Sequence, residues 1–133
     1  MPAAAEVRVL LVDDDPSFLD SLELLLGQEP RIRVVGRAGN GQEALQRALF
    51  LRPKVVTMDI EMPLMDGVAA TREIVASKLP IHVVLVSGSA HAERAEIARA
   101  SGAAALVTKS RVAEALLETI LAVASGSIFV LHV

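Results

Sequence analysis

Acidic, hydroxyl and basic side chains follow four separate apolar runs in this sequence. They are Asp13, Asp14 and Asp15, then Asp59, then Ser87, and finally Lys109. Carboxylates held close together repel one another, which raises one pKa or recruits a cation, and a ligand set made only of oxygen suits Mg²⁺. A lysine and a hydroxyl opposite them would bind an anion. This combination predicts phosphoryl transfer, a reaction in which positioning and charge neutralisation supply most of the catalysis.

Five valine-rich apolar runs have the length and composition of buried strands, and they span residues 7–12, 32–35, 55–58, 81–86 and 104–107. Segments with helical spacing follow them, at residues 16–26, 41–51, 67–77, 90–101 and 111–124. The first is the clearest, because Asp15 can cap it, Pro16 suits its first position and Gly27 can end it.

Five strands that alternate with five helices predict an α/β fold, a parallel sheet covered on both faces. Because right-handed crossovers restrict the topology, we predict a doubly wound, five-stranded sheet of order 2-1-3-4-5, as in flavodoxin-like proteins. The carboxyl ends of such strands share one crevice. The residues named above should therefore meet there.

Composition narrows the class of protein further. The 133 residues carry 13 Lys+Arg against 16 Asp+Glu, a net charge of −3, and 53% are hydrophobic. That balance predicts one folded domain and gives no support for a nucleic-acid surface in this chain. The sequence has no cysteine, no signal-peptide pattern and no apolar stretch long enough to span a bilayer, so we expect a cytoplasmic protein that binds no membrane.

From Val7 to about Ala124, the sequence resembles a receiver domain of the bacterial two-component response regulators. The matching pieces are Leu11-Val12-Asp13-Asp14, the stretch from Met58 to Gly67, Val86-Ser87-Gly88, Gly102-Ala103 and Val107-Thr108-Lys109. Their order and their places at strand ends make the resemblance specific.

The resemblance implies a role for each residue of the predicted crevice. Asp59 would be the phosphoacceptor. Asp13 and Asp14 would hold Mg²⁺ together with Asp59 and the backbone carbonyl of Glu61. Ser87 would bind a phosphoryl oxygen and Lys109 would pair with the phosphoryl group. Ser89, like Glu61, would flank the site and tune the lifetime of the phosphoryl group.

The resemblance also implies partners and an organisation. A histidine kinase would donate the phosphoryl group, and the chain would catalyse only its own phosphorylation and dephosphorylation. We expect residues 1–126 to form the receiver domain and residues 127–133 to be an apolar tail or the start of a linker. Parts of the sequence resemble receivers that precede a DNA-binding output domain, whereas Val56–Pro63 resembles the receivers of chemotaxis methylesterases. Any such output domain lies outside this chain.

Two positions depart from the family pattern. Leu106 stands where the family usually carries a switching aromatic residue, and Ser110 stands where it carries a proline after a cis bond. A cis bond before serine would cost about 3–4 kcal/mol, so we expect a trans bond there.

The last predicted helix is apolar on nearly its whole circumference, which exceeds what one sheet-facing stripe requires. An exposed apolar patch usually marks a partner surface. We therefore predict that Leu117 and Leu121, with the tail Ile128–Leu131 nearby, form a homodimer interface or dock an output domain. The alternative is that the tail folds back and covers the helix.

Two other functions remain open on these residues. The spacing of Asp13, Asp15 and Ser17 resembles that of haloacid-dehalogenase-like phosphatases, although the chain is short for that family. A flavodoxin-like FMN carrier fits the topology, but three carboxylates replace the usual phosphate cradle and the chain has no tryptophan or tyrosine to stack on a flavin.

Overall fold

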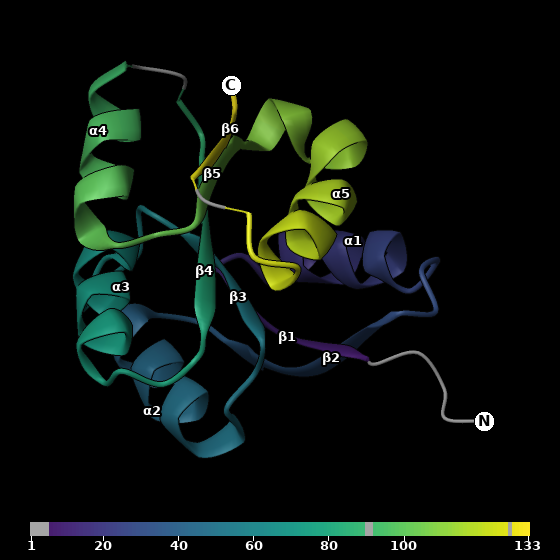
Figure 1. Ribbon diagram of the computed structural model, residues 1–133, viewed down its shortest axis with the longest axis horizontal. Coiled ribbons are helices and arrows are strands. Elements are labelled where there is room, and N and C mark those ends of the chain that lie inside the picture. Colours follow the sequence, from purple (N-terminus) through teal and green to yellow (C-terminus); the bar gives the residue numbers. More distant parts are fainter. Residues whose placement is uncertain (1–5, 90–91, 128) are drawn as a thin grey trace.

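The computed structural model describes residues 6–89, 92–127 and 129–133, in which strands and helices alternate along the chain (Figure 1). The elements are β1 (Val7–Val12), α1 (Pro16–Leu26), β2 (Ile32–Ala38), α2 (Gly41–Leu51), β3 (Val55–Asp59), α3 (Gly67–Ala76), β4 (His82–Ser87), α4 (Ala92–Ser101), β5 (Ala105–Thr108), the 3₁₀ turn η1 (Lys109–Arg111), α5 (Val112–Ala124) and β6 (Val130–His132). None of the helices described is long and apolar enough to cross a membrane.

All the strands pair in parallel, in the order β2-β1-β3-β4-β5-β6. The predicted fold class and the order 2-1-3-4-5 are confirmed. The predicted count of five strands is corrected to six, because Val130–His132 adds a strand beside β5. The segment 127–133 is β-like in composition, but its partner is not evident from the sequence because the pairing depends on the edge that β5 offers.

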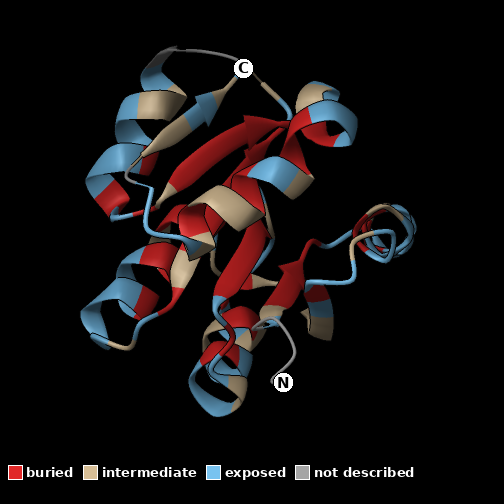
Figure 2. Ribbon diagram, turned by 45° about the vertical axis from the view of Figure 1, so that its right-hand side comes forward, coloured by how far each residue is buried: buried red, intermediate tan, exposed pale blue. Residues whose placement is uncertain are grey.

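Helices cover both faces of the sheet, with α2, α3 and α4 on one face and α1 and α5 on the other (Figure 1). Most of β1, β3, β4 and β5 is buried, shown in red in Figure 2, whereas β2 is mostly half-buried and the outer faces of the helices are exposed. Each face has its own apolar cluster. Side chains alternate along a strand, so Leu10 packs on the first face while Val9 and Leu11 pack on the second.

Local signals place α1 where the sequence predicts it. The Asp15 side chain accepts a hydrogen bond from Ser17 N–H at 2.9 Å, Pro16 occupies the first turn, and the helix ends at Gly27. Asp13 in turn accepts a hydrogen bond from Asp15 N–H at 2.9 Å. The path from β1 into α1 is therefore fixed by two side-chain bonds to the backbone.

The loop from β3 to α3 is held on both sides by glycines. Gly67 N–H donates to Ile60 O at 2.8 Å, and a Cβ on Gly67 would lie 2.2 Å from Asp59 O. Gly41 N–H donates to Met65 O at 3.0 Å, and a Cβ there would lie 2.1 Å from that oxygen. Only glycine permits these two close approaches.

The C-terminal tail folds back onto the edge of the sheet. Phe129 packs with the cluster on the α4 side and Val130 with the cluster on the α5 side. Leu117 and Leu121 of α5, predicted to face outward, are half-buried. Ile128, which belongs to the predicted tail, lies outside the described residues.

Candidate functional site

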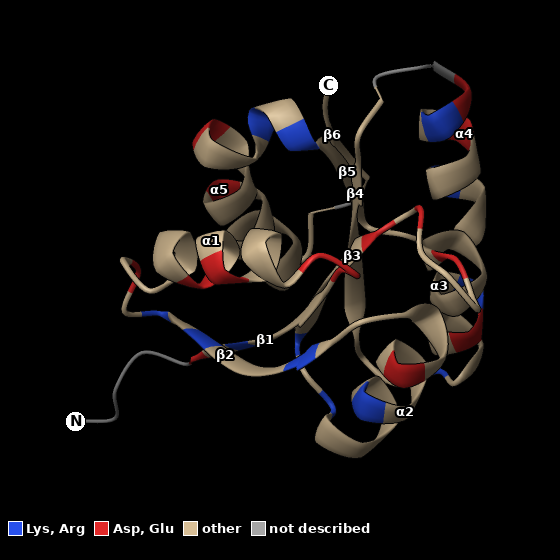
Figure 3. Ribbon diagram, turned by 180° about the vertical axis from the view of Figure 1, so that it is seen from behind, with Lys and Arg blue, Asp and Glu red and all other residues tan. Residues whose placement is uncertain are grey.

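Three carboxylates gather where β1 and β3 end. Asp13, Asp14 and Asp59 each offer an oxygen, and these oxygens all lie within 4.8 Å of one another. Asp13 and Asp59 are buried, whereas Asp14 is exposed. Figure 3 shows acidic segments at these strand ends. The predicted acidic cluster is thus assembled by the parallel register of neighbouring strands.

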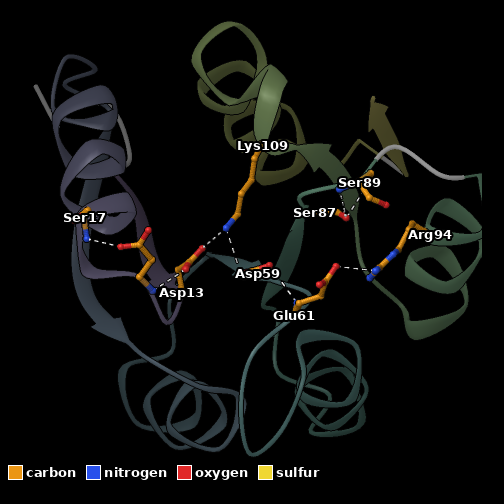
Figure 4. A network of polar contacts seen from close by, with 9 residues as sticks. Asp13, Ser17, Asp59, Glu61, Ser87, Ser89, Arg94 and Lys109 are labelled. Carbon is orange, nitrogen blue, oxygen red and sulfur yellow. Dashed lines mark hydrogen bonds and ion pairs between the residues drawn. The ribbon is translucent and has the colours of Figure 1, made fainter.

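Lys109 reaches this cluster from the end of β5 (Figure 4). Its Nζ lies 3.2 Å from Asp13 Oδ2 and 3.3 Å from Asp59 Oδ2. The lysine side chain is about one-third exposed, so the ammonium stays accessible from outside while it bridges two buried carboxylates. An anion that entered the crevice would meet this cation directly.

Burial and charge act on the titration of this cluster. Burial raises the pKa of Asp13 above its ordinary value of 3.8; the Asp59 charge adds to that rise, while the hydrogen bond from Asp15 N–H and the ammonium of Lys109 oppose it. Burial alone would lower the pKa of Lys109, but the two carboxylates outweigh it and raise that pKa. The lysine is therefore held in its charged form.

The donor set fits a hard divalent cation. Asp13 Oδ2 is buried and receives no hydrogen bond from the described residues, although it faces the Lys109 ammonium. A buried oxygen in this state is stabilised by a further cation. Asp59 Oδ1 accepts a hydrogen bond from Glu61 N–H at 3.1 Å, which holds the backbone of Glu61 beside the carboxylates.

Ser87 ends β4 and is fully buried. Its hydroxyl accepts from Ser89 N–H at 3.1 Å and lies 3.0 Å from Ser89 O, to which it donates. Figure 4 shows Ser87 and Ser89 on the other side of Asp59 from Asp13. The hydroxyl is engaged only within its own loop, among the contacts of the described residues.

Two contacts at the site are not predicted from the sequence. Arg94 of α4 donates to Glu61 Oε1 at 2.7 Å, a pair separated by 33 residues. The Phe18 ring lies under the Lys109 ammonium, 4.6 Å from centroid to Nζ. Helical periodicity assigns Phe18 to the apolar stripe of α1, and nothing in the sequence marks Arg94 for this contact.

The two departures from the family pattern have simple structural outcomes. Leu106 is fully buried, in the apolar cluster on the α4 side. The described residues contain no cis peptide bond, so the predicted trans bond between Lys109 and Ser110 is confirmed. The Ser110 hydroxyl lies 3.2 Å from that of Thr108.

The fold and the site together define a phosphoacceptor domain of the receiver class. The description "response regulator receiver domain" matches residues 9–121. The chain belongs to this family, and it is a signalling domain of two-component systems that accepts a phosphoryl group.

Curated relatives include protein-glutamate methylesterase/protein-glutamine glutaminase 3 of Myxococcus xanthus, 42% identical over 86% of this chain and 33% of the relative. Protein-glutamate methylesterase/protein-glutamine glutaminase 2 of Methanospirillum hungatei is 49% identical over 62% of this chain and 23% of its own length. The chain thus spans at most a third of the length of these relatives.

Solved structures of receiver domains have a similar fold. The receiver domain of the response regulator NarL of Mycobacterium tuberculosis has a TM-score of 0.88 at 29% identity, covering 92% of this chain and 99% of that one. The response regulator domain of CheB of Thermotoga maritima has a TM-score of 0.82 at 34% identity, covering 90% and 97%.

Proposed function

We propose that Asp59 is the phosphoacceptor of this receiver and that a histidine kinase supplies the phosphoryl group. The observation that carries this assignment is the position of the Asp59 carboxylate, buried at a strand end between an ammonium at 3.3 Å and two further carboxylates. A buried carboxylate opposite a cation can attack phosphorus. The same cation can then neutralise the negative charge of the new phosphoryl group.

In the transfer, an oxygen of Asp59 forms a bond to phosphorus while the bond from phosphorus to the donor's imidazole nitrogen breaks. The electron pair of the broken bond stays on that nitrogen, which then takes a proton from solvent. Lys109 neutralises one phosphoryl oxygen, and the Ser87 hydroxyl donates to another once it leaves Ser89 O.

Asp13, Asp14 and Asp59 would hold Mg²⁺, with the backbone carbonyl of Glu61 as a further ligand. Receiver domains bind Mg²⁺ at such an acidic cluster. Held by these residues, the ion would supply positive charge that offsets the repulsion between the Asp59 carboxylate and the incoming phosphoryl group. The buried Asp13 Oδ2, which faces the Lys109 ammonium but accepts no hydrogen bond from the described residues, and the all-oxygen donor set support this assignment.

We infer a chemotaxis-type output for the longer protein, in preference to DNA binding. The methylesterases among the curated relatives are 42–49% identical to this chain, which spans about a fifth to a third of their length. The LuxR-family regulators among the solved structures are 28% identical. The homodimer through α5 and the cytoplasmic location stay predictions.

The test is intact-protein mass after incubation with acetyl phosphate, with and without Mg²⁺. The wild type should gain one phosphoryl group that needs Mg²⁺, and Asp59→Asn should gain none. Asp66→Asn is the matched control, because Asp66 is an exposed helix cap a few residues away. Labelling that survives Asp59→Asn but is lost in Asp13→Asn, with donor turnover, would establish the phosphatase alternative instead.

A further inference from the structure

Among the described residues, two carboxylates and one uncharged aromatic ring surround the ammonium of Lys109. Asp13 and Asp59 lie at 3.2 and 3.3 Å, and the face of the Phe18 ring lies 4.6 Å away. An ammonium over an aromatic face is attracted by the negative potential of the ring. The cation therefore sits at a point that the carboxylates and the ring define together.

The position of the ring is set by the same loop that carries the acidic cluster. Asp13 accepts from Asp15 N–H, and Asp15 accepts from Ser17 N–H, so the chain enters α1 along one path. Phe18 follows in the first turn of that helix and is half-buried. A groove of about 300 Å³ between α1 and α5 has Phe18 and Lys109 in its lining.

The ring differs from the carboxylates in one property that matters for phosphoryl transfer. Carboxylate oxygens are ligands for a hard cation, and their charge is then shared between that cation and Lys109. An aromatic ring is no ligand for such a cation. Among the ammonium contacts that the structure describes for Lys109, the Phe18 face is the one for which a cation in the acidic cluster would not compete.

We propose that Phe18 is a positioning residue for phosphoryl transfer, whose ring face holds the Lys109 ammonium over the acceptor carboxylate. This proposal rests on the proposed function of Asp59. Without the ring, the flexible lysine chain is free to turn toward solvent, and a smaller fraction of encounters finds the cation in place.

A fluorination series at Phe18 tests the proposal, because fluorine drains the negative potential of the ring with little change in its size. The probe is acetyl phosphate with Mg²⁺, and the readout is the rate of phosphorylation by intact mass. We expect the rate to fall stepwise from mono- to trifluorophenylalanine, by about two- to fivefold in all. Phe18→Leu should fall to the same level, and Phe18→Tyr should keep the wild-type rate.

Phe129 provides a matched control, since Arg99 lies over its ring at the same distance of 4.6 Å. Fluorination there should leave the rate unchanged. A second readout needs no phosphodonor: in metal-free protein, the upfield ring-current shift of the Lys109 Cε protons should disappear in Phe18→Leu.

The outcomes separate the two proposals. If Asp59→Asn abolishes labelling while the Phe18 series stays flat, Phe18 only packs and the positioning role is wrong. If Asp59→Asn is still labelled, the proposed function fails first. A rate loss of equal size at Phe18 and Phe129 would indicate a general effect of fluorination and would also overturn the positioning role.

Discussion

The two halves of the crevice are built differently. On the side of β1 and β3, Asp13 and Asp59 are tied to Lys109 and to backbone N–H groups, and glycines fix the loop that follows. On the side of β4, the Ser87 hydroxyl bonds only to Ser89 among the described residues, and apart from its chain neighbours none of these residues lies within 4 Å of the position of a Cβ on Gly88. The acidic half is assembled before any phosphoryl group arrives. If Ser87 binds a phosphoryl oxygen as proposed, its hydroxyl must first leave Ser89 O, so we expect the movement in response to phosphorylation on the side of β4.

The largest expected effect contrasts two glycines, one from each half. Gly67→Ala should lower the free energy of unfolding by about 3 kcal/mol, because the new Cβ would lie 2.2 Å from Asp59 O. Gly88→Ala should change it by no more than about 0.5 kcal/mol, since the space there is open. Urea denaturation measures both. Similar losses in the two variants would show that the halves are equally rigid.

Removal of the cation from the acidic half comes next. Lys109→Met should lower the stability of metal-free protein by about 1–2 kcal/mol, since two buried carboxylates lose their partner while the exposed part of the lysine limits the loss. Mg²⁺ should then stabilise this variant more than the wild type in thermal unfolding. Ser87→Ala serves as the control from the other half, with a Mg²⁺ response like that of the wild type.

The pH dependence of Mg²⁺ binding also belongs to the acidic half. The pKa of Asp13 is raised above 3.8 by burial, so the folded protein takes up a proton at a higher pH than the unfolded chain does. Metal-free stability should therefore gain from Asp13 as pH falls through its raised pKa, while the stabilisation by Mg²⁺ is lost over the same window.

Thermal unfolding with and without Mg²⁺, from about pH 7.5 to about pH 4, measures both trends. In Asp13→Asn the opposed trends should vanish. A Mg²⁺ effect that stays constant down to pH 4 would mean that Asp13 does not titrate in this window.

The smallest effect concerns the one ion pair described between the halves, Arg94 with Glu61 at 2.7 Å. Glu61 is mostly exposed, so a double-mutant cycle with Arg94→Ala and Glu61→Gln should give a coupling below about 1 kcal/mol. The coupling should shrink further in high salt. A coupling that salt does not change would place this contact within the rigid half.

The helix boundaries and the meeting of the strand-end residues could be predicted from the sequence. Helix α1 begins after the cap Asp15, with Pro16 in its first turn, and ends at the cap Gly27, as capping chemistry predicts. The predicted helix 41–51 has the same bounds as α2. Strand-end residues were brought together because parallel register makes their meeting a consequence of topology.

What sequence reasoning missed depends on tertiary placement. The three residues of β6 gain their pairing from the edge of β5. The partner of Arg94 lies 33 residues away, and Phe18 keeps its apolar spacing in α1 whether or not a lysine sits over its ring. Patterns within a single element carry no information on such contacts.

The sixth strand has a consequence for local unfolding. β6 is the outermost strand of the sheet, has three residues, and pairs with β5 on one side. Beyond it, Arg111 Nη1 donates a hydrogen bond to Val133 O at 3.2 Å. β6 can detach without breaking any ladder between the inner strands, so its opening free energy lies far below that of global unfolding. We therefore expect the amide hydrogens at the margin of the sheet beside β5 to exchange early while the crevice stays intact.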